Sequence, residues 1–400
     1  MNSSIKILFI TSANLAANPR LLKELRLAVS YGYKCTVLQF DLGNWSDAGT
    51  KEIELEFPHV RFINLSAQRK PFIPWLISSV LEKIFSSLPI HFLSLHRLSI
   101  AISKRSFLLL HQVRQFKKKK LDWVIAHNPA SFYPALYAAR HCNAKLGIDI
   151  EDYHPGETNH YPSQRRTQRF MCKILPLADY CSYASPLIAN QVQQDIPEMK
   201  NHQIVLLNGF LAEEFLTPQN NSESVLKIVW FSQHIASGRG LEQIIPVINK
   251  LHPKVELHFF GNVNHNFEQN FIYNKTGIFF HGILSQKELH HKLSEFDVGL
   301  ATDLPVNRNR DIALTNKIFA YAQAGLVIAA MHTEAQDQFL QSGELQYVQM
   351  HNKPATIENA FLQLYHNKVS GKFNMLDQYQ KAQQYCWEKI SQPLKTIWES

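Results

Sequence analysis

The sequence is poor in the features that mark several large classes of protein. Its 400 residues contain five isolated cysteines with no CxxC pair, so we expect reduced thiols in a cytosolic protein. No apolar window reaches about 18 residues, and no basic stretch followed by an apolar one precedes the first strand. We therefore expect neither a membrane-spanning helix nor a secretory signal.

Motifs for common cofactors and for nucleic acids are also missing. The first loop, 12–20, lacks the G-x-G-x-x-G turn that cradles a pyrophosphate, which argues against an NAD dehydrogenase. No pair of histidines has metal-ligand spacing such as H-x-x-x-H, so we expect no metal. RNA-binding aromatic signatures and zinc-finger spacings are absent too, and we expect no nucleic-acid partner.

Acidic residues are absent from one basic segment. Residues 83–121 contain nine Lys or Arg and no Asp or Glu, although the whole chain carries a net charge of only +8. Apolar residues recur in this segment near helical spacing, and the apolar run 72–77 precedes it. One interpretation is that residues 72–120 lie on an anionic membrane as a basic amphipathic surface. The alternative is a core helix whose Lys117–Lys120 end is solvated and compensates the helix dipole.

Short apolar strands alternate with helical patterns along the chain. The first strand, 6–11, precedes a helix that begins at Asn18-Pro19, and the next strand follows at 34–40. The same alternation continues to about residue 207 and, after the polar segment 213–224, resumes from 226 to 330. This rhythm predicts an α/β protein with two doubly wound, Rossmann-like parallel sheets.

The most informative stretch is Leu314-Thr-Asn-Lys-Ile-Phe-Ala-Tyr-Ala-Gln-Ala-Gly325, which an apolar run follows. The pattern predicts a helix with Lys317 in its first turn and Gly325 at its end. Unpaired N–H groups at a helix start, with a cation beside them, form a receptacle for phosphate oxygens. The segment resembles the "NKxFxYxxxG" helix of GT-B glycosyltransferases, near the GT4 family, in which the matching element grips the diphosphate of a sugar nucleotide.

Other motifs extend this resemblance over nearly the whole chain. Segment 122–128 is similar to the strand that delivers a His to the interdomain cleft, and 204–209 is similar to the V-x-x-N-G before the linker. Segment 237–242 resembles the loop whose Arg, here Arg239, pairs with the diphosphate. The resemblance implies two Rossmann-like domains that face each other across a cleft. It places an acceptor domain at 1–212, a linker at 213–224, a nucleotide-sugar donor domain at 225–376 and a returning C-terminal helix at 377–400.

The candidate donor site centres on Arg239 and Lys317. These cations and the helix-end N–H groups could stabilise the charge that develops on a departing diphosphate. The alternative is a surface Arg in a Gly-Arg-Gly turn and a capping Lys. Asn316 is a donor candidate that more readily serves as a cap, together with Thr315. Gly261 either lets the nucleotide approach the backbone or is a plain turn glycine.

The candidate catalytic cluster is Ile148-Asp-Ile-Glu-Asp-Tyr-His-Pro-Gly-Glu157. Asp149 falls within the strand pattern, which suits a structural role, whereas Glu151, Asp152, His154 and Glu157 follow the strand. They could bind acceptor hydroxyls or accept a proton, and the segment resembles the "D-x-H-E/D" strand end of the family. The alternative is a loop with local hydrogen bonds. His127, at another strand end, is either a further site residue or a core histidine.

Asn14 and Arg20 complete the candidate set as contacts for the acceptor or the donor sugar. Pro19 and Arg20 could equally be ordinary residues of a helix start.

One departure from the family concerns ribose binding. Relatives carry a Glu-x7-Glu pair whose positions are occupied here by Ile312 and Ala320. Asp303, Arg310 and Asp311 could replace the lost polarity, which favours a divergent enzyme over an inactive one.

The leading hypothesis is metal-independent transfer of a sugar from a nucleotide sugar to a lipid-linked or cell-surface polysaccharide acceptor, with no cofactor besides the co-substrate. The resemblance implies retention of the anomeric configuration and a place in polysaccharide biosynthesis. We expect a cytoplasmic location, which could include peripheral binding to the inner face of the membrane. The rival functions are a nucleotide-sugar epimerase of the same fold and a catalytically silent binding or scaffold protein.

Overall fold

The structure is a computed structural model that describes residues 4–218, 223–273 and 275–400. It divides into two compact units. The first comprises Met1–Leu206 together with Pro393–Ser400, and the second comprises Leu207–Gln392. The predicted linker at 213–224 falls within the second unit, and its residues 219–222 lie outside the described residues.

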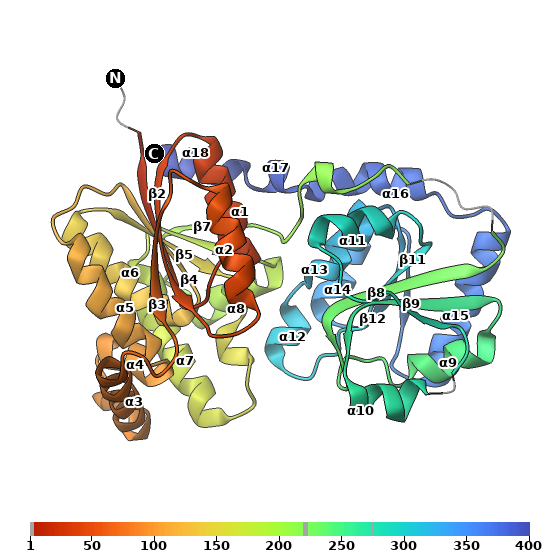
Figure 1. The fold of residues 1–400 in the computed structure, drawn as a ribbon, viewed down its shortest axis with the longest axis horizontal. Helices are drawn as coiled ribbons and strands as arrows, with labels where there is room; N and C mark the ends of the chain where they lie inside the picture. The colour runs from red at the N-terminus through yellow and green to blue at the C-terminus, as the bar shows by residue number, and fades with distance from the viewer. Residues whose placement is uncertain (1–3, 219–222, 274) are drawn as a thin grey trace. The chain divides into compact units, whose positions relative to one another are not determined.

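The first unit is built on a parallel sheet of seven strands in the order β3-β2-β1-β4-β5-β6-β7. The strands are β1 (Lys6–Thr11), β2 (Lys34–Asp41), β3 (Arg61–Ser66), β4 (Trp123–His127), β5 (Lys145–Ile150), β6 (Tyr180–Tyr183) and β7 (His202–Val205). The helices between them are α1 (Pro19–Ser30), α2 (Ser46–Glu56), α3 (Phe72–Ser87), α4 (Leu95–Ile102), α5 (Arg105–Val113), α6 (Pro129–Cys142), α7 (Tyr161–Ile174) and α8 (Pro186–Asp195) (Figure 1).

The second unit is built on a parallel sheet of six strands in the order β10-β9-β8-β11-β12-β13. The strands are β8 (Leu226–Ile235), β9 (Val255–Val263), β10 (Ile278–Phe280), β11 (Val298–Ala301), β12 (Val327–Met331) and β13 (Tyr347–Met350). Its helices include α9 (Ile244–Leu251), α10 (His265–Phe267), α11 (Gln286–Leu293), α12 (Arg308–Ile312), α13 (Asn316–Gln323), α14 (Glu334–Ser342) and α15 (Pro354–Val369). The predicted pair of Rossmann-like parallel sheets is therefore confirmed.

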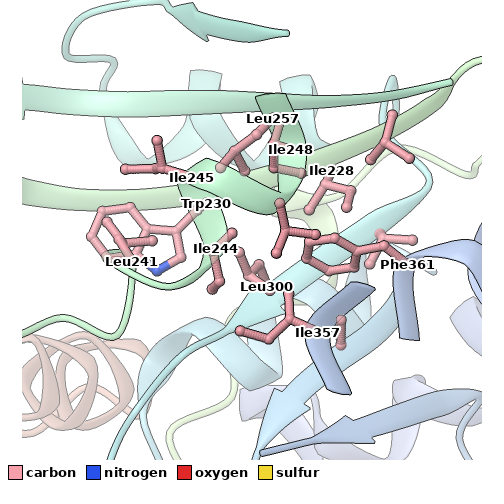
Figure 2. Packing of buried hydrophobic residues seen from close by; sticks show 14 of the residues in the cluster. Ile228, Trp230, Leu241, Ile244, Ile245, Ile248, Leu257, Leu300, Ile357 and Phe361 are labelled. Carbon is pink, nitrogen blue, oxygen red and sulfur yellow. The ribbon is translucent and has the colours of Figure 1, made fainter. Parts of the chain in front are cut away.

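Figure 2 shows the core of the second unit, in which α9 and α15 pack against the sheet. Ile244, Ile245 and Ile248 of α9 have no exposed surface, because the helix carries its isoleucines at the spacing that keeps them on one face. Phe361 of α15 is equally buried. This packing holds β8 and β11 in place, and their carboxyl ends carry the site residues described below.

The end of the chain is divided into α16 (Met375–Ala382), α17 (Trp387–Ile390) and α18 (Gln392–Glu399), where the sequence suggested one helix over 377–400. Its last eight residues belong to the first unit. Trp398 is buried there, with its indole N–H donating to the Tyr180 hydroxyl at 3.2 Å. The Trp123 indole donates in turn to the Trp398 carbonyl at 3.0 Å.

The basic segment 83–121 is not one continuous helix. It runs from the end of α3 through α4 and α5, and Leu98, Leu109 and Val113 are buried in the core of the first unit. The alternative of core helices therefore holds for these residues, and the exposed apolar side chains lie on α3 instead. None of the described helices has both the length and the apolar character needed to cross a bilayer.

Candidate functional site

Three neighbouring strands of the first unit end in a chain of hydrogen-bonded polar side chains. Thr11 ends β1, Asn128 follows β4 and Glu151 follows β5. The Thr11 hydroxyl donates to Asn128 Oδ1 at 2.8 Å, and Asn128 Nδ2 donates to Glu151 Oε1 at 2.5 Å. Because the carboxyl ends of parallel strands meet at one edge, these three hydrogen-bonded side chains lie where open α/β sheets bind ligands. Asn128 adopts φ +69°, in the left-handed region that Asn tolerates better than most residues.

Glu151 has the titration behaviour of a proton acceptor. Its burial, together with the nearby negative charge of Asp149, raises the pKa of the Glu151 carboxyl to about 7. A carboxylate with a pKa near neutrality can take up and release a proton under ordinary conditions. Asn128 fixes one carboxylate oxygen, so the structure holds the group in a defined orientation.

Beneath this edge lies a quartet of buried charged residues, Arg20, Glu24, His127 and Asp149. Arg20 grips Asp149 with two bonds, Nε to Oδ2 at 2.8 Å and Nη2 to Oδ1 at 2.6 Å. His127 lies between the two carboxylates, with Nδ1 3.3 Å from Asp149 Oδ2 and Nε2 3.4 Å from Glu24 Oε2. Two cations and two anions compensate one another, which burial requires.

The pKa shifts in the quartet have clear physical causes. Burial opposes the charge of the His127 imidazole, but the Glu24 and Asp149 carboxylates outweigh it and raise the His127 pKa to about 10. Burial likewise opposes ionisation of Asp149, but the Arg20 guanidinium holds the Asp149 pKa well below its usual range. His127 is therefore charged at neutral pH.

Glu24, His127 and Asp149 also offer ligand atoms within 4.8 Å of one another, a spacing compatible with a metal ion. In the structure, Arg20 bonds to both oxygens of Asp149, so this carboxylate is already paired with a cation. The contacts of the four residues form a network of alternating charges.

The loop after Glu151 contains the remaining catalytic candidates, and its histidine is engaged locally. His154 is buried, its Nδ1 lies 3.1 Å from Glu157 Oε1, and its ring meets Phe132 edge-on. Burial opposes the charge of His154, but Glu157 outweighs it and raises the His154 pKa. Asp152 accepts the His154 backbone N–H through its carbonyl at 2.9 Å. The alternative of local hydrogen bonds thus describes His154 and Glu157.

The structure places both predicted acceptor contacts in the interior. Asn14 has no exposed surface and donates through Nδ2 to Ser46 Oγ at 2.8 Å and to Asp47 Oδ1 at 3.1 Å. Arg20 is 3% exposed, and its third bond runs from Nη1 to the Leu206 carbonyl at 2.8 Å. These positions contradict direct acceptor contact for both residues, because their polar atoms face groups of their own unit. His127, with no exposed surface, is likewise a core residue.

In the second unit, Arg239 occupies a tight turn after β8. The flanking Gly238 and Gly240 have φ of +78° and +75°. A Cβ at Gly240 would lie 2.5 Å from the Thr302 carbonyl oxygen, so only glycine fits there. The Thr302 hydroxyl donates to the Arg239 carbonyl at 2.5 Å, which fixes the turn against the end of β11.

Lys317 lies in the same region. Its Nζ is 5.5 Å from the centroid of the Trp230 ring, a cation–π arrangement. The Trp230 indole N–H donates to Thr302 Oγ1 at 3.0 Å. Thr302 therefore links Trp230, which contacts Lys317, to the turn that contains Arg239. Among the described residues, neither the Arg239 guanidinium nor the Lys317 ammonium forms an ion pair or a hydrogen bond; Arg239 is held through its carbonyl and Lys317 contacts the Trp230 ring.

The start of α13 is uncapped. Thr315 occupies the N-cap position without a capping side-chain bond and donates instead to Asp303 Oδ2 at 3.1 Å. Asn316 is exposed at the first helical position. The prediction that Thr315 and Asn316 cap the helix is therefore wrong for Thr315, and the first N–H groups stay available to an anion.

The other donor candidates are spread around this region. Gly261 adopts φ +134°, and a Cβ there would lie 1.8 Å from the Ser232 carbonyl, so its close approach is to the neighbouring strand. Arg310 is exposed on α12. Asp311 is half-buried and engaged, with Oδ1 accepting the Glu334 backbone N–H at 2.9 Å and Oδ2 lying 3.2 Å from Arg308 Nη1.

The two positions that carry glutamates in the resembling family are fully buried. Ile312 and Ala320 have no exposed surface. The next residue, Tyr321, packs against Phe231, with ring centroids 5.4 Å apart. Both positions are therefore apolar and closed to solvent, so polar recognition of a ribose would need other groups.

Sequence reasoning overlooked four residues that this geometry involves. Asn128 was recognisable as the residue after a strand and before Pro129, but its bond to Glu151 was not. Glu24 lies one helical turn after Arg20 on α1, yet nothing in the sequence indicates that it faces His127. Trp230 lies within the apolar pattern of β8 and Thr302 directly follows that of β11, so neither gave a separate signal.

Comparisons with known proteins identify the fold. No protein-family model matches this chain, and no curated protein matches it in sequence. Solved structures match it along nearly its whole length. HepE of Anabaena in complex with UDP has a TM-score of 0.66 at 14% identity, covering 99% of this chain and 100% of that one.

Two further structures give the same result. Sucrose-phosphate synthase of Thermosynechococcus elongatus has a TM-score of 0.67 at 13% identity, covering 99% of this chain and 98% of that one. TarM of S. aureus, solved with Fondaparinux, alpha-GlcNAc-glycerol and UDP, has a TM-score of 0.68 at 10% identity, covering 99% and 100%. This chain therefore shares the fold of GT-B glycosyltransferases.

Proposed function

We propose that this protein is a glycosyltransferase that moves a sugar from a nucleotide sugar to a lipid-linked or cell-surface polysaccharide acceptor without a metal. The fold supports this, since its solved neighbours include HepE with UDP-glucose and TarM with UDP. The single observation that carries the proposal is the placement of Arg239 and Lys317. Both are half-buried cations without an anionic partner among the described residues, joined through Trp230 and Thr302.

The proposed donor site binds the diphosphate through complementary charge. The uncapped start of α13 presents N–H groups and the positive end of the helix dipole. Lys317 adds a point charge, and Arg239 adds a planar donor that can grip two phosphate oxygens. As the sugar–phosphate bond breaks, negative charge grows on the diphosphate, and these groups stabilise it more in the transition state than in the ground state.

In the first unit, Glu151 is the proposed proton acceptor for the acceptor hydroxyl. Asn128 orients its carboxylate, and its pKa of about 7 suits general base chemistry. The buried quartet is a positioning device, since Asp149 sits two residues before Glu151 at the end of the same strand. Retention of the anomeric configuration stays a prediction from the resemblance, and the anomeric proton coupling of the product tests it.

Calorimetric titration with UDP, GDP and ADP tests the donor site. We expect one of the three to bind, and Arg239→Ala and Lys317→Ala each to weaken it by about 1.5–3 kcal/mol, the range for hydrogen bonds to charged groups. Lys287→Ala, an exposed cation on α11, is the matched control and should bind as the wild type does. Unchanged affinity in both site variants removes the donor site as proposed.

A specific observation also favours a second candidate, a catalytically silent binding or scaffold protein. The buried Ile312 and Ala320 leave no carboxylate at the positions where the resembling family has glutamates. Absence of binding to all three nucleotides would support the scaffold. Turnover of a nucleotide sugar without any acceptor would instead identify the epimerase.

A further inference from the structure

The first unit contains a largely apolar cavity of about 400 Å³. It lies between the end of β3, the first turns of α3 and the middle of α5, and its lining includes Leu65, Trp75, Ile77, Phe107 and Leu108. The volume is in the range that small-molecule ligands occupy. None of the residues assigned to sugar transfer lines it.

An exposed apolar surface continues outward from this cavity along α3. Phe72, Ile73, Leu76, Ile77, Val80 and Ile84 are each between 42% and 68% exposed. Their spacing places them on one face of the helix. Such a contiguous apolar surface is rare on a soluble protein and marks an interaction site.

Basic side chains lie at and beside this cavity. Lys70 lines it, and Arg69 and Lys104 lie over the Trp75 ring with their charged atoms 5.2 and 5.0 Å from its centroid. No Asp or Glu is found among the described residues of the lining. The cavity therefore suits a ligand with a hydrocarbon body and an anionic end.

The cavity lies at the same sheet edge as Glu151. Leu65 and Ser66 end β3, and carboxyl ends of parallel strands share one edge. Four strand spacings separate β3 from β5 in the sheet order, roughly 19 Å at about 4.8 Å per strand. Arg105, at the start of α5, donates to the Ser12 carbonyl at 2.6 Å and ties this helix to the loop after β1.

We propose that this cavity binds one hydrocarbon chain of a phosphorylated lipid, with Lys70, Arg69 and Lys104 meeting the phosphate and the apolar face of α3 meeting the surrounding lipid. The binding itself stands on the geometry of the first unit. Its role as the anchor of the acceptor rests on the proposed function, because it would extend the polar head along the sheet edge toward Glu151.

Calorimetry with hexyl, octyl and decyl phosphate, each below its micellar concentration, tests the cavity in the full-length protein. We expect a single site whose affinity rises about fourfold per methylene, the equivalent of about 0.8 kcal/mol. Inorganic phosphate and decyl alcohol should each bind much more weakly than decyl phosphate. A stoichiometry above one, or equal binding of inorganic phosphate, overturns the proposal.

Variants that fill the cavity separate it from the exposed face. Leu108→Trp and Ile77→Trp should lower decyl phosphate affinity at least tenfold. Val80→Trp, at an exposed position of α3 outside the lining, should leave it unchanged. Ile77 is 45% exposed, so its variant is expected to fold even if Leu108→Trp does not. Binding by Ile77→Trp as strong as that of the wild type contradicts the site.

The contribution of Lys70 to phosphate binding is tested by Lys70→Gln. This variant should bind decyl phosphate about two- to fivefold more weakly, the range for an exposed ion pair. Lys83→Gln, an exposed lysine of α3 outside the lining, is its control. Identical affinities for these two variants would remove Lys70 from the site. Titration of the wild type with UDP and with decyl phosphate keeps the two hypotheses apart. Decyl phosphate binding without nucleotide binding contradicts the transferase, and nucleotide binding without decyl phosphate binding contradicts the lipid site. The cavity variants should bind UDP as the wild type does.

Discussion

Replacing His127 with Gln tests the buried charge quartet most directly. Gln keeps a polar side chain of similar length but removes the positive charge that lies 3.4 Å from Glu24 and 3.3 Å from Asp149. Asp149 keeps Arg20, whereas Glu24 loses the cation that compensates it in the interior. Removing one partner of a buried ion pair costs about 3–5 kcal/mol, which is the destabilisation we expect for the first unit.

The pH dependence of the wild type gives an independent magnitude. The folded pKa of His127, about 10, exceeds its value of 6.5 when unfolded, so its stabilisation is complete below pH 6.5 and is lost as the pH rises toward 10. At 1.36 kcal/mol per pH unit, His127 should lose about 2 kcal/mol of its contribution to the free energy of unfolding between pH 7 and 8.5. Buried thiols such as Cys35 and Cys181, with pKa values raised to about 12, titrate above that interval.

Amide hydrogen exchange read by mass spectrometry on peptides from β4 and β5 measures this local stability. After correction for the intrinsic exchange rate, wild-type protection should fall roughly 30-fold from pH 7 to 8.5, while His127→Gln should show a low and pH-independent value. His141→Gln, at an exposed histidine of the same unit, is the control and should follow the wild type. Constant wild-type protection over this interval would refute a charged His127.

Three further predictions concern chemistry, the donor turn and the surface. Glu151→Gln should lower turnover about 10²- to 10⁴-fold with nucleotide affinity intact, and the wild-type rate should fall below pH 7 as the carboxyl is protonated; an acidic limb that persists in the variant argues against this role. Gly240→Ala should cost more stability than Gly238→Ala, because both pay about 1–2 kcal/mol for positive φ but only the first meets the Thr302 carbonyl; equal melting temperatures would contradict the contact. Neutralising the exposed Lys117–Lys120 should weaken sedimentation with anionic vesicles by about 1 kcal/mol per lysine, and unchanged sedimentation would leave α3 as the membrane-facing element.

Local patterns were enough to predict the two sheets and to place Glu151 and Arg239 after strands. Short apolar strands alternating with helical segments have few packing solutions, and parallel sheets bring their carboxyl ends to one edge. Glu151 and Arg239 were therefore placed at strand ends before any contact was known. The Gly-Arg-Gly turn was recognisable because only glycine tolerates the backbone that such a turn requires.

Arg20 and Asn14 were predicted as ligand contacts but lie in the interior, because the groups that they bond to are distant in sequence. Arg20 and Asp149 are separated by 129 positions, and no local pattern tells whether an Arg in the first turn of a helix faces solvent or a buried carboxylate. Asn14 is buried for the same reason, since its hydrogen-bond partners Ser46 and Asp47 begin α2, more than 30 positions further along the chain.

Composition and periodicity alone determined that the chain forms two Rossmann-like units with polar groups at their strand ends. They could not determine which apolar face would be covered, since α3 and α5 both have apolar residues at helical spacing. Leu109 of α5 is buried and Ile73 of α3 is 68% exposed. That difference depends on which neighbours pack against each helix, and only the tertiary structure decides it.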